Sequence, residues 1–166
     1  AILPTLLYGD RSLVARSEAE AGILGLKLGQ MLLPLPRHRF RPSADVAERY
    51  ISAGSAPGLA SESHASALGL LATLGFLALL AYLFGARLPT SSPETLTVLA
   101  RLSLAAVLLA TVGGFGSIFV TFVSAQIRAY NRISVFLGFI ALAGLGLVLD
   151  AILARTRAER RPAVAW

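Results

Sequence analysis

Two arginines, a tyrosine and an asparagine share one very short segment, residues 128–132, as Arg128, Tyr130, Asn131 and Arg132. Two guanidinium groups this close together can hold a phosphate or pyrophosphate through bidentate hydrogen bonds, with the tyrosine and the asparagine supplying further bonds. The same residue types at the end of a membrane helix also serve as anchors that reach lipid phosphates. The segment therefore indicates a substrate-phosphate site or a lipid anchor, and composition alone favours the anchor.

A second basic cluster lies at residues 37–41, where Arg37, His38 and Arg39 precede Phe40 and Arg41. These side chains could join the first cluster to form one anionic site. Binding to anionic lipid headgroups is the alternative, and it requires no special geometry.

Candidates for acid–base chemistry are few. Asp10 is the candidate general base, because Glu18 and Glu20 fall in the first turn of a predicted helix, where acids have a structural role. His64, near Glu62, has a proton-transfer interpretation and a more common one as a hydrogen-bonded helix cap. The sequence contains no cysteine and no nucleophile elbow, phosphate-binding glycine loop or zinc-protease spacing, so we expect no metal site, and nothing indicates a cofactor.

The elements that must position these residues are hydrophobic helices. The chain is 55% hydrophobic and 14% charged, with a mean hydropathy of +0.71, well outside the range of soluble domains. Uncharged runs at 65–86, 102–127 and 133–154 are each long enough to cross a hydrocarbon core of about 30 Å. The sequence predicts an all-α integral membrane protein with three transmembrane helices. The net charge of +6 lies largely beside these runs, which argues against nucleic acid as a partner.

The arginines also predict orientation. The basic tail at 155–166 should be cytoplasmic by the positive-inside rule, and residues 87–101 then form a cytoplasmic loop. Residues 128–132 become an extracytoplasmic loop and residues 9–64 an extracytoplasmic segment. The apolar stretch 1–8 is typical of the end of an earlier span, which suggests that further helices belong to a larger chain or complex.

An interfacial helix is predicted at about 18–33, because Ser17 and Glu20 have the spacing of a capping box. Lys27 and Gln30 join Glu20 in a narrow polar stripe, and leucines cover the rest of the surface. The helix could lie at the membrane interface or pack against a part of the protein that lies outside this sequence. A second short helix is expected to start near Ser43.

Small residues recur on the second run, at Ala106, Ala110 and Gly114, and would allow a neighbouring helix to approach closely. The cluster Gly113, Gly114 and Gly116 is the only interruption of that run. Ser134 and Gly138 repeat the spacing on the third run. Asp150, near the end of that run, should face protein or reach the cytoplasmic interface.

Several strings carry a family resemblance. The string Gly113-Gly-Phe-Gly116, followed by 126–134, resembles a segment of bacterial multi-spanning inner-membrane proteins labelled sugar translocases or GT-C-like glycosyltransferases. The strings at 19–34, running into 37–39, and at 67–70 look like the same family. The resemblance covers about half the chain and is to a C-terminal portion.

This resemblance implies transfer of a sugar or related group from a polyprenyl-phosphate donor at the outer face of the inner membrane. Arg128 and Arg132 would hold the donor phosphate, and Arg37, His38 and Arg39 could complete the site. Enzymes of this kind place a catalytic acid in their first outward loop, a position that Asp10 fits only loosely.

Two rival functions stay open. The chain could be a non-catalytic membrane subunit that scaffolds a larger complex, which the scarcity of acids favours. It could instead be half of a transporter, which predicts broken helices with polar groups at the membrane midplane. Only the glycine cluster near residue 114 points to the latter.

Overall fold

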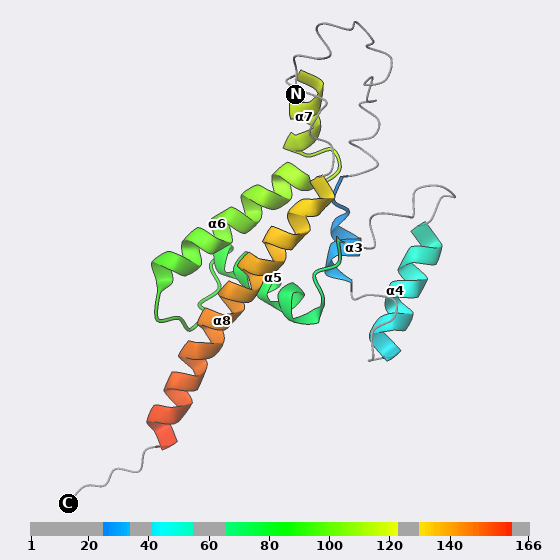
Figure 1. Ribbon diagram of the computed structural model, residues 1–166. Helices are drawn as coiled ribbons and strands as arrows, with labels where there is room; N and C mark the ends of the chain where they lie inside the picture. Colours follow the sequence, from blue (N-terminus) through cyan, green and yellow to red (C-terminus); the bar gives the residue numbers. More distant parts are fainter. Residues whose placement is uncertain (1–24, 34–40, 55–65, 123–129, 161–166) are drawn as a thin grey trace, which may run out of the picture.

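The computed structural model describes residues 25–33, 41–54, 66–122 and 130–160, and these residues contain helices and loops but no β-strand. Three longer helices pack against one another in pairs: α5 (Leu70–Leu83), α6 (Pro93–Ala110) and α8 (Ile133–Arg160). Figure 1 shows α5, α6 and α8 grouped together, with α5 packed along α8. The shorter elements are α3 (Leu28–Leu32), α4 (Arg41–Gly54), α7 (Phe115–Phe122) and the 3₁₀ turn η3 (Tyr130–Arg132).

The tightest contact joins α5 to α8. A Cβ atom on Gly75 would overlap the carbonyl oxygen of Ala141, so the two backbones touch at this point. One turn further along, Gly144 of α8 receives the side chain of Leu79. Such close approach between these helices requires glycine, and small residues have the same role in membrane helix pairs.

Two hydrophobic clusters hold the helices together. The first contains Leu26, Ala110, Tyr130 and Leu137 among its buried members and lies at the η3 end of the bundle. The second lies near the other end of α6 and joins the following buried residues from three helices: Leu79, Leu96, Ala100 and Val148. The clusters fix the antiparallel pairing of α6 and α8.

The outer surface of the helices is strongly apolar. α6 and the helix running from Tyr130 to Ala158 are long and apolar enough to cross a membrane, yet only 22% and 28% of their most apolar windows are buried. Phe139 is 74% exposed and Val135 71% exposed on α8. Helices buried in a soluble core would instead cover such side chains. The described residues therefore agree with the predicted all-α class and show membrane-like helical character.

The prediction of one continuous helix over 102–127 is wrong. Helix α6 begins earlier, at Pro93, and ends at Ala110, and α7 begins only at Phe115. The backbone at Gly113 has φ +74°, a conformation that costs an L-residue about 1–2 kcal/mol and that glycine adopts freely. The glycine cluster therefore divides the run into two helices.

The prediction of one helix over 18–33 is also wrong in its described part, which begins at residue 25. Only Leu28–Leu32 are α-helical, and Leu26 forms an isolated bridge with Thr111. Leu26 and Met31 are fully buried in the first cluster, so this segment packs into the bundle. The sequence predicts a helix at the membrane interface or against a part of the protein outside this sequence, whereas the described part of the segment packs against the helices of this chain.

Other predicted boundaries agree more closely. Helix α8 begins at Ile133, as expected, but continues to Arg160, so residues 155–160 are helical. Helix α5 occupies only Leu70–Leu83, 14 residues of the predicted span 65–86, and is shorter than the two described helices that are long enough to cross a membrane. Helix α4 begins at Arg41, close to the expected Ser43, and the ring of its Tyr50 lies against Gly29 of α3.

Candidate functional site

The break between α6 and α7 is held by Leu26, from a distant part of the chain. The amide of Leu26 donates a hydrogen bond to the carbonyl of Ala110 (2.8 Å), and the amide of Val112 donates to the carbonyl of Leu26 (3.2 Å). A broken helix exposes backbone groups that an apolar medium cannot satisfy. Leu26 provides partners for two of these groups, which makes the break a stable feature of the fold.

The η3 turn packs directly on this break. A Cβ atom on Gly116 would lie 3.0 Å from the ring of Tyr130, and the ring is 94% buried in the first cluster with Leu26 and Ala110. Gly116 is therefore required for close approach. The break, the bridge and the η3 turn form one unit, which we call the break site: Leu26, residues 110–116 and residues 130–132.

Asn131 is the unusual residue of the break site. Its side chain is 9% exposed, and its Oδ1 atom is buried without a hydrogen-bond partner. A buried acceptor without a donor costs about 1–3 kcal/mol, so such an atom calls for a functional explanation. The described residues contain two others, Oε1 of Gln30 and Oγ of Ser103.

Arg132 follows Asn131 and is exposed at the end of the bundle. The 28-residue helix α8 begins at the next residue, Ile133. Its first amides have no partner within the helix and carry the positive end of the helix dipole. A guanidinium and a helix N-terminus therefore meet at one place, which suits an anionic group.

The structure brings together three of the residues that the sequence singled out. Tyr130, Asn131 and Arg132 share the η3 turn, but the Tyr130 ring packs inside the bundle. The other predicted site residues lie outside the described residues: Asp10, Arg37, His38, Arg39 and Arg128. The role of the unpaired Asn131 oxygen could not be seen in the sequence, because burial depends on contacts with α6 and α8.

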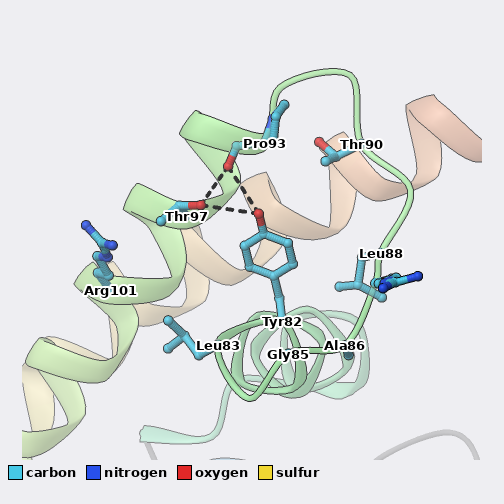
Figure 2. A pocket seen from close by; sticks show the side chains of 10 residues that line it. Tyr82, Leu83, Gly85, Ala86, Leu88, Thr90, Pro93, Thr97 and Arg101 are labelled. Carbon is cyan, nitrogen blue, oxygen red and sulfur yellow. Dashed lines mark hydrogen bonds between the residues drawn. The ribbon is translucent and has the colours of Figure 1, made fainter.

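A second candidate site lies at the opposite end of α6. It is a pocket of about 510 Å³ between the end of α5, the loop after it and the first turns of α6. Figure 2 shows Tyr82 at its centre, with its hydroxyl directed at Pro93 and Thr97. The Tyr82 hydroxyl lies 3.2 Å from Oγ1 of Thr97, which itself donates to the carbonyl of Pro93 at 2.8 Å.

Two arginines line this pocket, Arg87 from the loop and Arg101 from α6, and no acidic residue lines it. Both guanidiniums are exposed and have no ion-pair partner among the residues that the structure describes. Its walls also carry Leu83 and Leu88. The sequence predicts a loop at residues 87–101, which include both arginines, although Ser92 followed by Pro93 is typical of a helix start.

The arrangement can bind anions at both ends of α6, and within the described ranges no group of three His, Cys, Asp or Glu residues is placed to hold a metal ion. The break site adds a buried acceptor oxygen, which can receive a hydrogen bond from a hydroxyl group. Comparison of the chain with protein-family models, with curated proteins and with solved structures found no match.

Proposed function

We propose that this chain is a portion of a bacterial inner-membrane glycosyltransferase-like protein that binds polyprenyl-phosphate-linked sugars at the outer face. The observation that carries the proposal is the unpaired Oδ1 of buried Asn131 beside Arg132 at the start of α8. Arg132 and the helix N-terminus bind the phosphate diester. Because Oδ1 is buried, the η3 turn must open on binding so that Asn131 accepts a hydrogen bond from a sugar hydroxyl, which supplies the donor that this oxygen lacks.

The spacing of charges on α8 supports a transmembrane placement. Arg132 and Asp150 are separated by about 27 Å of helix at about 1.5 Å per residue, close to the thickness of a hydrocarbon core. We propose three spans, formed by α5, by α6 with α7, and by α8, with residues 9–64 and η3 outside and the end of α8 in the cytoplasm. The chain packs with further helices of a larger chain or complex.

The binding test uses the purified chain in lipid nanodiscs and two probes, a polyprenyl monophosphate carrying one hexose and the bare polyprenyl monophosphate. Asn131→Leu should weaken binding of the hexose-carrying lipid by about three- to tenfold, the effect of one hydrogen bond. The bare lipid should bind as before. Arg132→Gln should weaken binding of both lipids, because both carry the phosphate.

A matched control is Ser103→Ala, which removes the unpaired buried oxygen of α6. This variant should bind both lipids like the unmodified chain. Equal weakening by Asn131→Leu and Ser103→Ala would show that buried oxygens affect only folding. Absence of binding to either lipid would reject the proposal.

The rival function is a non-catalytic subunit that scaffolds a larger complex, and absence of lipid binding is what it predicts. The break after Ala110 is a feature that a transporter half would share. Ala110 clusters with Tyr130 and Leu137, however, which places the break near the Arg132 end of the proposed span. A transporter site would lie at the midplane, so the position of the break favours a site at the outer face.

A further inference from the structure

The pocket of Figure 2 is separate from the break site. Helix α6 begins beside the pocket and ends at the break, and its pocket-lining residues Pro93, Thr97 and Arg101 lie roughly 14–26 Å of helix before Ala110 at about 1.5 Å per residue. The proposed sugar-lipid site therefore does not account for the two unpaired arginines of the pocket.

The position of the pocket along the helices indicates that it lies at the level of lipid headgroups. The second hydrophobic cluster joins Leu79, Ala100 and Val148. Arg101 directly follows Ala100 in α6, and Asp150 lies two residues after Val148 in α8. Arg87 precedes Leu88, which packs against the same cluster. Charged side chains from three segments thus lie at one level, as expected where hydrocarbon meets lipid headgroups.

The residues that line the pocket suit an anionic ligand that also carries an apolar group. Arg87 and Arg101 supply charged donors without competing carboxylates. The hydrogen bonds that link Tyr82, Thr97 and Pro93 fix the wall between loop and helix. Leu83 and Leu88 provide the apolar part of the wall, which free phosphate would not use. Basic pockets between membrane helices on the cytoplasmic side bind lipid phosphates in this way.

We propose that this pocket binds the phosphate group of an anionic phospholipid headgroup, with Arg87 and Arg101 as its cationic ligands and the Tyr82 hydroxyl network as its scaffold. The inference uses the membrane placement proposed above, but it needs neither a sugar donor nor a reaction. It assigns a lipid-binding role to the cytoplasmic end of the helices.

The test measures lipid retained by the full chain in nanodiscs of phosphatidylcholine containing one-fifth phosphatidylglycerol. Arg87→Gln and Arg101→Gln should each lower retention of phosphatidylglycerol about fivefold, the effect of one basic residue near an anionic surface. Tyr82→Phe changes no charge and should lower retention as well, because the wall loses its hydroxyl link. Arg157→Gln is the matched control, since Arg157 is exposed on α8 but does not line the pocket.

Equal losses in Arg101→Gln and Arg157→Gln, with no loss in Tyr82→Phe, would overturn the proposal, because general charge attraction would then suffice. Displacement of the lipid by equimolar inorganic phosphate would show a free-phosphate site and overturn the assignment to lipid. All pocket variants should keep their binding of the hexose-carrying polyprenyl phosphate. Failure of this proposal is thereby separable from failure of the sugar-lipid site, and helical content checks that each variant folds.

Discussion

Replacing Gly75 by alanine should lower the free energy of unfolding by about 3 kcal/mol, at the upper end of the usual cost of overpacking. The added Cβ would overlap the carbonyl oxygen of Ala141 and come within 2.8 Å of its carbonyl carbon. These are backbone atoms of α8, so no side-chain rotation can relieve the clash. The two helices must move apart, which also loosens the packing of Leu79 against Gly144.

The measurement is reversible unfolding of the chain in mixed micelles as the fraction of sodium dodecyl sulfate rises. Gly146→Ala is the control, because a Cβ at Gly146 meets no atom within 4 Å. That variant should be as stable as the unmodified chain or slightly more stable, since alanine favours helix. Equal stability of the two variants would contradict the close contact between α5 and α8.

Replacing Leu26 by proline should disrupt the break site more than any loss of side-chain volume there. Proline has no amide hydrogen, so the carbonyl of Ala110 loses its donor at the end of α6. Leu26→Ala keeps this hydrogen bond and loses only packing, at a cost of about 2–5 kcal/mol. We expect Leu26→Pro to be less stable than Leu26→Ala by about 2 kcal/mol, the cost of an unsatisfied buried group.

Hydrogen exchange of the Val112 amide gives a local measure of the same bridge. This amide donates to the Leu26 carbonyl and should be protected in the unmodified chain and in Leu26→Ala. It should exchange faster in Leu26→Pro, because loss of the Leu26 amide bond separates the two segments even though proline keeps the carbonyl that accepts from Val112. Fast exchange of the Val112 amide in the unmodified chain would mean that the two segments are not paired.

Local sequence properties were sufficient to predict where α8 begins and the all-α class. An uninterrupted apolar run bounded by arginine specifies a helix through composition alone, and α8 starts at Ile133 as predicted. The start of α6 was missed because Glu94 and Arg101 interrupt the apolar pattern. The helix signal at this point is instead local, with Pro93 in the first turn after Ser92.

The break and its bridge depend on contacts that local patterns do not contain. The glycine cluster marked a weak point in the second run, but glycine also occurs inside continuous membrane helices. The chain leaves the helix here because the Leu26 amide donates to the carbonyl of Ala110 and the Leu26 carbonyl accepts from the amide of Val112. Leu26 itself lay in a segment whose apolar periodicity predicted helix, and the tertiary pairing outweighed that propensity.

The candidate sites also combine features that local sequence predicts with features that depend on tertiary contacts. Residue types at 128–132 indicate either a substrate-phosphate site or a lipid anchor and favour the anchor, and the structure adds that Asn131 is buried with an unpaired oxygen. The pocket around Tyr82 was not predicted, because its walls come from α5, the following loop and α6. Only a tertiary structure brings Arg87 and Arg101 to one cavity.

We propose that the exposed apolar face of α8 lies in lipid. The chain has no cysteine, so single cysteines can report on it without background. We propose Phe139→Cys, at a side chain 74% exposed in the structure, and Arg157→Cys, at an exposed residue near the end of α8. Both are measured in open membrane fragments with a water-soluble maleimide, which reacts only with the hydrated thiolate.

We predict rapid labelling of Arg157→Cys and little labelling of Phe139→Cys until detergent denatures the membrane and the chain together. Equal labelling of the two intact variants would place the apolar face of α8 in water and contradict the membrane placement.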